Sequence, residues 1–325
     1  MATPSSTFTQ MVTSTARYWG QEVTDNVSNH NALLRRLKDK GNIKTVGGGY
    51  ELVFPTDYDE NDTYQRYNGF DALNTNINEI LTSVRYPWQQ IALHIVSSGR
   101  ELRMNSGPEK MIDLVMAKKK NAMRTAQNNF SIDLYSSGAL TNQIGGLAQI
   151  ITTDGTGTVG GIVSGTYTWW KNKFLDNHMT TTSTPSLADS TILLGDMNTM
   201  WLQLARGADK PDLIVSSHDF FAMYEVAQQD KQRYTDEGMA KAGFTGYKYK
   251  GTDVIFDSNS NFGTTAEKMY FLDTDYLYLV QHKEAKWTTD EEKTPINQDA
   301  VVVPMYWMGN LVCTRRAAQG VIFDS

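Results

Sequence analysis

The sequence predicts an α+β fold with a projecting arm, and three observations lead to this prediction. A 26-residue segment, 55–80, shows no helical stripe and lies between two strand-like segments. A single long helix is expected over residues 108–135, where apolar residues recur at helical spacing. Residues 145–290 then alternate between helix-like and strand-like segments, as expected for a compact α/β-type layer.

The composition is that of an ordinary soluble globular protein. Apolar residues make up 40% of the 325 residues and charged residues 20%, which allows a sizeable core and excludes a wholly disordered chain. The net charge of -6 argues against a protein whose whole surface binds nucleic acid, but it allows a locally basic face. The single cysteine, Cys313, excludes an internal disulfide and a thiolate metal cluster. No membrane segment or signal peptide is recognisable, so no membrane partner is expected. Synthesis in a reducing cytoplasm is expected instead.

A short amphipathic helix is expected in the segment NALLRRLKDKGNIKT, residues 31–45. Leu33, Leu34 and Leu37 share one side of this helix, and Gly41 is expected to end it. The basic residues around that apolar side are Arg35, Arg36, Lys38 and Lys40. Two interpretations stay open, an ordinary surface helix and a patch that faces DNA.

Residues 50–96 predict a long two-stranded flap. The segments YELVF and WQQIALHIV have the composition of strands, and the residues between them have no clear core face. Compact domains rarely contain structureless connections longer than about 12–15 residues, and such connections are usually functional. Tyrosine and arginine are enriched at protein interfaces. The flap is therefore expected to pack on another subunit, and the alternative is a loop folded over its own domain. The expected contact residues are Tyr58, Tyr64, Arg66, Tyr67 and Phe70.

The strongest helix signal lies over residues 106–137. Ser106 and Glu109 form an S-x-x-E capping box with Pro108 in the first turn, and Gly138 is expected to end the helix. At 1.5 Å per residue the 28 residues from Pro108 to Tyr135 would span about 42 Å as a helix and act as a stiff beam. One buried stripe is predicted from Ile112, Met116, Met123, Ala126, Phe130 and Leu134.

The C-terminal half is expected to alternate strands and helices. IGGLAQIITT is strand-like, and the segment TYTWWKNKFLDNH places Tyr167, Trp170 and Phe174 on a helical face. A helix over DMNTMWLQLARG is expected to begin at Asp196 and to stop at Gly207.

Further strands and one more helix complete this half. PDLIVSS predicts a buried strand that leads into a helix over HDFFAMYEVAQQ, opened by Ser216. The later strand-like segments are GYKYKGTDVIFD, MYFLDTDYLYLV and DAVVVPMYWMGNLVCTRRAAQGVIF, with a turn expected at SNSNFGTT.

No motif predicts a catalytic, cofactor or metal site. GTGTVG at 155–160 matches G-x-G-x-x-G, with Asp176 near the place of a ribose-binding acid, but no helix is expected to open at these glycines. The segment DYDENDTYQRYN begins like a calcium loop, yet Asp62 and Asn68 stand where that loop needs glycine and glutamate. The five histidines are scattered, and Cys313 is expected to be a buried, inert thiol.

Several segments, taken in order after a hairpin and a long helix, resemble the major capsid proteins of tailed bacteriophages, which have the Hong Kong 97-like fold. These segments are IGGLAQII, PDLIVSSHDFFAMY, GFTGYKYKGTDVIFDSNS before MYFLDTDYLYL, and GNLVCTRRAAQGVI. The resemblance covers nearly the whole chain.

The resemblance implies a domain for each part of the chain. Residues 1–49 would be the N-terminal arm, and residues 50–96 would be the extended E-loop that lies over a neighbouring subunit. Residues 97–144 would form the peripheral domain around its spine helix, and residues 145–280 the axial domain. Residues 281–325 would complete both domains with strands.

The resemblance also implies a function and partners. Similar proteins assemble through pentamers and hexamers into an icosahedral shell that encloses double-stranded DNA, held by weak, non-specific contacts. The implied partners are further copies of the chain, a separate scaffolding protein, a portal and decoration proteins. Assembly in the host cytoplasm and a final place in the virion capsid follow from this.

One departure and two alternatives accompany this hypothesis. Some similar proteins cross-link through a lysine on the E-loop, but residues 55–80 contain no lysine, so noncovalent contacts are expected. A non-viral, encapsulin-like nanocompartment of the same fold is the first alternative. A nucleotide-dependent enzyme that uses the loop at 155–160 is the second.

Overall fold

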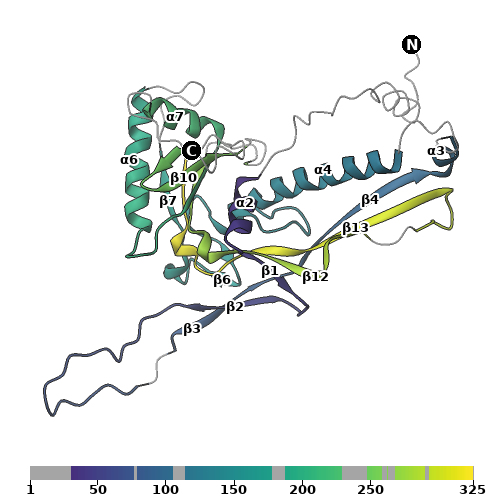
Figure 1. Ribbon diagram of the computed structural model, residues 1–325. Coiled ribbons are helices and arrows are strands. Elements are labelled where there is room, and N and C mark those ends of the chain that lie inside the picture. Colours follow the sequence, from purple (N-terminus) through teal and green to yellow (C-terminus); the bar gives the residue numbers. More distant parts are fainter. Residues whose placement is uncertain are drawn as a thin grey trace.

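The computed structural model consists of a long spine layer, a layered α/β body and a projecting hairpin (Figure 1). It describes residues 31–76, 79–104, 114–177, 187–228, 247–257, 262, 268–289 and 293–324. The expected capping box of Ser106, Pro108 and Glu109 lies outside the described residues, as does all of the expected SNSNFGTT turn except Phe262. None of the helices within these ranges is long and apolar enough to cross a lipid bilayer.

The spine layer is a four-stranded sheet with a long helix lying along it (Figure 1). In sheet order the strands are β1 (Ile43–Val46), β12 (Leu277–Thr289), β13 (Ala300–Cys313) and β4 (Gln89–Ser98). β1 runs parallel to β12, and the other two pairs are antiparallel. The helices of this layer are α3 (Gly99–Met104) and α4 (Leu114–Tyr135).

Aromatic contacts hold α4 on this sheet. The Phe130 ring lies edge-on to Trp307 of β13, with 4.8 Å between ring centroids, and edge-on to Trp287 of β12. Ala126 and Leu134 are buried on the same side as Phe130. The predicted apolar stripe is therefore confirmed over this part of the helix, while Met123 is only half-buried and the side chains of Ile112 and Met116 lie outside the described residues.

The segment after α4 turns back sharply onto the helix end. The helix ends at Tyr135, three residues before the predicted stop, and Gly138 has a φ of +66°, a left-handed conformation that suits glycine in this turn. The expected strand at IGGLAQIITT is wrong, because residues Leu147–Ile150 form a short helix, α5. Leu147 and Ile150 are three residues apart, and the helical turn buries both of them, which a two-residue strand alternation would not do.

A six-stranded mixed sheet with two helices forms the α/β body, which we call the axial body after the domain that the sequence resemblance implies (Figure 1). In sheet order its strands are β7 (Lys173–Asp176), β14 (Gly320–Phe323), β11 (Lys268–Leu272), β8 (Leu213–Ser216), β10 (Thr252–Phe256) and β9 (Tyr247–Tyr249). Its helices are α6 (Leu187–Leu204) and α7 (His218–Gln228). All four residues of β8 are buried, as predicted for PDLIVSS, because both faces of the strand are covered: Leu213 and Val215 pack into one hydrophobic cluster and Ile214 into another.

Three local predictions for this body are wrong. Trp170 ends a 3-10 turn (Thr168–Trp170) instead of lying on a longer helix, and Phe174 belongs to β7, which pairs in parallel with β14. Asp196 lies inside α6, where its carboxylate accepts a hydrogen bond from Asn177, so it does not begin the helix. Ser216 is the last residue of β8, and α7 begins two residues later.

Two connections join the axial sheet to the spine sheet. The first, between β11 and β12, contains the 3-10 turn Thr274–Tyr276, and the second, between β13 and β14, contains the 3-10 turn Arg316–Ala318. The Arg315 guanidinium lies 2.6 Å from the Asp209 carboxylate and donates to the Tyr276 hydroxyl. This contact ties both connections to the axial body.

The flap differs from the prediction in its second strand. β2 (Leu52–Asp57) pairs antiparallel with β3 (Leu81–Tyr86), while the predicted partner WQQIALHIV forms β4 of the spine sheet. Pro87 separates β3 from β4, and proline removes the backbone N–H that a continuous ladder would need. The alternation within β4 is as expected for a strand, but its apolar face packs in the spine layer.

Candidate assembly interface

The β2–β3 hairpin carries a loop that leaves the body of the subunit. The two strands pair from Leu52 opposite Tyr86 to Asp57 opposite Leu81, and the Tyr58 amide donates to the Ile80 carbonyl oxygen at 3.0 Å. Beyond this pair the chain projects away from both sheets (Figure 1). We call the hairpin and this loop, residues 52–86, the arm.

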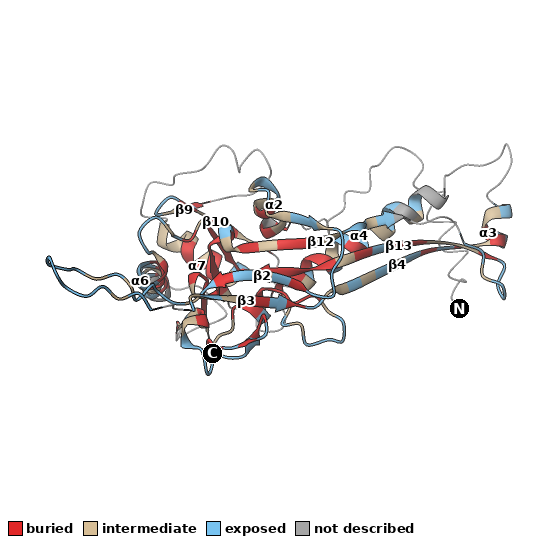
Figure 2. Ribbon diagram, turned by 90° about the horizontal axis from the view of Figure 1, so that it is seen from below, coloured by how far each residue is buried: buried red, intermediate tan, exposed pale blue. Residues whose placement is uncertain are grey.

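Aromatic side chains of the arm are left uncovered by the subunit. Tyr64 is 83% exposed, Tyr67 is 66% exposed and Phe70 is fully exposed, and Arg66 beside them is exposed too. Figure 2 shows the projecting loop in the colour of exposed residues. Burying one such ring contributes roughly 1.5–3 kcal/mol, so this surface is suited to contact with another molecule.

Hydrogen bonds within the loop give it a defined shape. The Asn68 amide donates to the Asp71 carboxylate at 2.8 Å. The Gln65 side chain bridges the two sides of the loop, since its nitrogen donates to the Ala72 carbonyl and its oxygen accepts from the Asn74 amide. An arm shaped in advance loses less conformational entropy when it binds.

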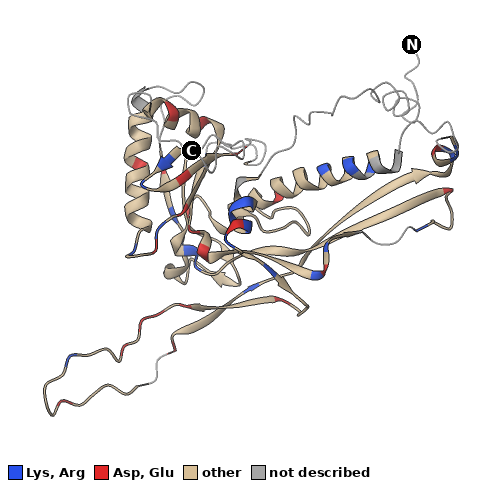
Figure 3. Ribbon diagram, viewed as in Figure 1, with Lys and Arg blue, Asp and Glu red and all other residues tan. Residues whose placement is uncertain are grey.

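The arm is also strongly acidic. Residues 57–80 contain six acidic residues and one arginine, a net charge of -5 within a chain of -6. Figure 3 shows these acidic positions spread along the loop. Charge complementarity fixes register at interfaces, so the arm fits a partner surface that is apolar in places and not acidic.

The base of the arm is fixed to its own subunit. The Tyr58 ring stacks on Trp169 with 5.6 Å between centroids, and the Thr56 hydroxyl donates to the Thr314 carbonyl oxygen. The Tyr86 hydroxyl donates to the carbonyl oxygen of Cys313 at 3.0 Å. Tyr58, predicted as an inter-subunit contact, therefore packs within the chain, and the other four predicted arm residues are the exposed ones.

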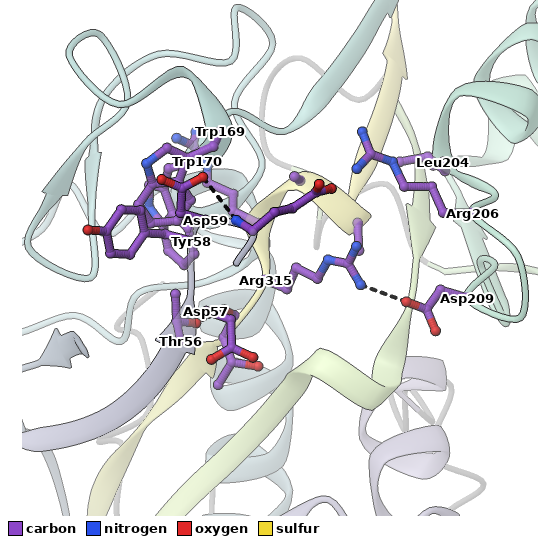
Figure 4. A pocket seen from close by; sticks show the side chains of 15 residues that line it. Thr56, Asp57, Tyr58, Asp59, Trp169, Trp170, Leu204, Arg206, Asp209 and Arg315 are labelled. Atoms are coloured by element: carbon purple, nitrogen blue, oxygen red, sulfur yellow. Dashed lines mark hydrogen bonds and ion pairs between the residues drawn. The ribbon is translucent and has the colours of Figure 1, made fainter. Parts of the chain in front are cut away.

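A pocket of about 440 Å³ opens where the arm meets the axial body. Figure 4 shows Tyr58 and Trp169 on one side of this pocket and Arg315, bound to Asp209, on the other. Its walls carry charges of both signs, and within the described residues no group of three His, Cys, Asp or Glu side chains could hold a metal ion. The geometry is that of a junction between arm and body.

The glycine-rich loop supports the arm base. β5 (Thr158–Val159) and β6 (Ile162–Val163) form a tight hairpin, and the turn residues Gly160 and Gly161 both have positive φ, at +62° and +77°. Glycine is needed at both positions of such a turn, and a Cβ on Gly160 would also meet Val84 of the arm at 3.0 Å. The loop opens no helix, so it lacks the helix N-terminus that a dinucleotide site requires.

Three of the four predicted DNA-facing residues form ion pairs within the chain. Helix α2 (Ala32–Asp39) forms as expected, with Leu33 and Leu37 fully buried. Arg36 and Lys40 point to the axial body, where both pair with Asp212, at 3.1 and 2.8 Å. The ion pairs beyond these contacts join Arg36 to Asp253, Lys40 to Asp275, and Arg35 to Asp39, while Lys38 is exposed.

This ion-pair cluster contains two carboxyl groups whose pKa values shift in opposite directions. Burial alone would raise the pKa of Asp212, but hydrogen bonds from Lys40 and Thr274 outweigh it and lower that pKa. Burial raises the pKa of Asp273 to about 6, and the neighbouring charges of Asp212 and Asp275 add to the shift. The ionised Asp212 carboxylate therefore stabilises the fold, and an ionised Asp273 carboxylate destabilises it.

Opposite responses are therefore expected from two conservative variants. Asp273→Asn should raise the melting temperature at pH 7.5, because the folded state no longer holds an ionised carboxylate there, and this gain should vanish below about pH 4. Asp212→Asn should cost about 1–2 kcal/mol at pH 7.5, and this loss should shrink as the pH falls below about 4. Both variants are tested by thermal unfolding of unassembled subunits, measured at intervals of about one pH unit between pH 3.5 and 7.5. Gains for Asp273→Asn that do not depend on pH would contradict the electrostatic origin.

Comparison with solved structures finds capsid and encapsulin proteins whose structures match nearly the whole chain. The cyanophage A-1(L) capsid asymmetric unit is 16% identical, with 94% of this chain and 95% of that chain covered and a TM-score of 0.64. The capsid of an empty GTA particle is 10% identical, with 94% of each chain covered and a TM-score of 0.58. The holo-SrpI encapsulin complex of Synechococcus elongatus PCC 7942 is 9% identical, with 99% and 96% covered and a TM-score of 0.53. No family model and no curated protein matches the chain.

These structures match this chain over most of its length. The fold suggested by the sequence resemblance is therefore confirmed. The chain has the Hong Kong 97-like fold of shell-forming capsid subunits.

Proposed function

We propose that this chain is the major capsid protein of a tailed bacteriophage. It assembles through pentamers and hexamers into an icosahedral shell around the double-stranded DNA genome. The observation that carries this proposal is the arm, which leaves a body of capsid fold with Tyr64, Tyr67 and Phe70 uncovered. Its work is assembly rather than turnover.

The energetics favour an assembled state. A subunit that donates its arm to one neighbour also receives the arm of another, so each contact is made many times around a closed shell. Linked contacts of this kind add stability without any single one being strong. Since residues 55–80 contain no lysine, noncovalent contacts of the arm supply this stability.

Further partners follow from the same proposal. A separate scaffolding protein directs assembly in the host cytoplasm, a portal occupies one vertex, and decoration proteins bind the outside of the virion shell. Packaged DNA makes weak, non-specific contacts with the inner surface.

The test is the assembly state of the purified chain. Negative-stain microscopy and analytical ultracentrifugation of the full chain, with and without a co-expressed scaffolding protein, should show closed shells of uniform size. A species that stays at 36.5 kDa under every condition would refute the proposal.

An encapsulin-like nanocompartment is the second candidate, since the SrpI encapsulin complex covers 99% of this chain. The contents of shells purified from the native source decide between the two. Nuclease-protected DNA supports the capsid, and a protected protein cargo with a cargo-enzyme gene nearby supports the compartment. A nucleotide-dependent activity of the loop at 155–160 would instead require saturable cofactor binding that Gly157→Ala abolishes.

A further inference from the structure

Helix α4 covers one face of the spine sheet, and the described residues leave the distal half of the other face uncovered. Ile95 of β4 and Met305 and Trp307 of β13 are buried on the α4 side, where Trp307 contacts Phe130. Side chains alternate between the two faces of a strand, so the residues between these point away from α4. Figure 1 shows α4 along one side of β4 and β13, and no described element along the other side of their distal half. We call this second surface the open face, and it consists of Gln90, Ala92, His94, Val96, Val302, Pro304, Tyr306 and Met308.

The open face carries no lysine, arginine, aspartate or glutamate. Its residues stand opposite each other across the two strands as Gln90 with Met308, Ala92 with Tyr306, His94 with Pro304 and Val96 with Val302. Val96 is 50% exposed and Tyr306 is 39% exposed, and Ala92 and His94 are exposed too. The solvated face of an antiparallel sheet is normally polar, and an exposed apolar surface marks a site of interaction. The open face is therefore suited to docking rather than to solvent.

The base of the arm already occupies the near end of this side of the sheet. Tyr278 of β12 stands opposite Val312, which lies an even number of residues along β13 from Tyr306 and so on the same side. Phe54 of β2 stacks on the Tyr278 ring, with 6.1 Å between centroids. The open face thus continues a surface on which the arm of the same chain makes its own contact.

The loop of the arm does not lie on the open face of its own subunit. Tyr58 is stacked on Trp169 and Thr56 is bonded to Thr314, so the direction in which the loop leaves is fixed at its base. Figure 1 shows the loop leading away from the distal half of β4 and β13, on the side of the spine sheet opposite α4. An arm that covers the open face therefore comes from a second copy of the chain.

We propose that the open face receives the arm loop of a neighbouring copy. This inference rests on the proposed function, because it names the surface that takes the arm within the shell. The exposed rings of Tyr64, Tyr67 and Phe70 need apolar surface, and an arm with a net charge of -5 meets no acidic side chain there. The strand from Gln90 to Val96 is about 20 Å long, and about ten residues on each side of the loop reach roughly 30 Å, so the loop can cross the face.

Two other pairings fit the residues less well. DNA is bound through cations that neutralise its phosphates, and the open face has no lysine or arginine. Helix α6 also exposes aliphatic side chains, Ile192 and Leu202, but these stand about 15 Å apart along the helix and form no continuous surface. The open face combines adjacent apolar residues with the absence of acidic ones.

Substitutions of opposite charge at two exposed positions of the open face test the proposal. Ala92→Glu with Val96→Glu places carboxylates under the acidic arm, and the shell yield should fall about tenfold or more, because like charges across an interface repel. Ala92→Lys with Val96→Lys should assemble like the unmodified chain, since lysine keeps its ammonium group in water while its stem contacts the rings. Circular dichroism of unassembled subunits checks that both variants fold. Normal shells from the glutamate variant, or equal losses in both variants, would overturn the proposal.

Cross-linking between two differently substituted chains identifies the occupant directly. The sole native cysteine, Cys313, is buried, so a thiol reagent reacts with introduced cysteines. Chains with Phe70→Cys are co-assembled with chains carrying Val96→Cys and treated with a short bis-maleimide, and chains carrying Thr199→Cys, on the exposed side of α6, replace the latter in the control. The Val96→Cys mixture should give about tenfold more linked pairs of chains than the control, because docking raises the effective concentration of the two thiols.

The outcomes separate this inference from the proposed function. Linked pairs in the Val96→Cys mixture support the open face as the receiving surface. Closed shells without that preference, or with preferred linkage to α6, overturn the inference and leave the proposed function standing. A chain that forms neither shells nor linked pairs under any condition overturns both.

Discussion

Replacing residues 59–79 by an Asn-Gly turn should give a folded subunit that no longer closes into shells. The cut leaves Tyr58 opposite Ile80, a pair already joined by a backbone hydrogen bond, so a two-residue turn can close the hairpin. The removed residues include the exposed aromatic groups and form no part of either buried core cluster. Microscopy should show no closed shells, while circular dichroism and the melting temperature of the subunit stay close to those of the full chain.

Two full-length variants separate arm length from arm chemistry. Tyr64, Tyr67 and Phe70 changed together to serine should also weaken or abolish assembly, because each ring is expected to contribute about 1.5–3 kcal/mol on burial. Thr75→Ser with Asn76→Ser, at exposed polar positions of the same loop, should assemble normally. Shells of normal size from the shortened arm would show that the interface lies elsewhere.

Gly146→Ala is expected to destabilise the subunit by about 3 kcal/mol. The backbone of Gly146 is extended and open to any residue, so the reason is space alone. An added Cβ would lie 2.4 Å from the Asp133 carbonyl oxygen, 2.5 Å from the Ser136 nitrogen and 2.7 Å from the Leu134 carbonyl oxygen. These are backbone atoms at the end of α4, which can move only if the helix end or α5 shifts.

Gly195→Ala is the matched control with the opposite sign. Gly195 lies inside α6 on its exposed side, and a Cβ there would meet nothing within 4 Å. Alanine should therefore stabilise the helix by roughly 0.5–1 kcal/mol, because it reduces the conformational entropy lost on folding. Scanning calorimetry of unassembled subunits measures both changes. Equal effects of the two substitutions would rule out the steric explanation for Gly146.

The candidate interface shows how much of a contact surface can be predicted from residue types alone. Tyr64, Arg66, Tyr67 and Phe70 were predicted as contacts, and the structure leaves all four exposed, although their partner surface stays a prediction. Tyr58 carries the same chemistry and the same sequence neighbourhood, yet it packs on Trp169 of its own chain. The difference is set by a residue more than a hundred positions away, which no local pattern reveals.

The basic residues of α2 illustrate the same limit for charge. The sequence shows four cations around an apolar stripe but cannot show that Asp212, far along the chain, receives two of them.

The sequence by itself determined the long helix, the buried strand β8 and the projecting segment, because each depends on local periodicity or on length without a core face. The kind of fold came from the resemblance of several segments to a known family. Tertiary structure decided that β3 and not β4 closes the arm, that Leu147–Ile150 within IGGLAQII is helical, and that Asp196 lies within a helix. Strand partners and helix starts depend on contacts between distant segments, where burial and pairing outweigh the weak preferences of a few neighbouring residues.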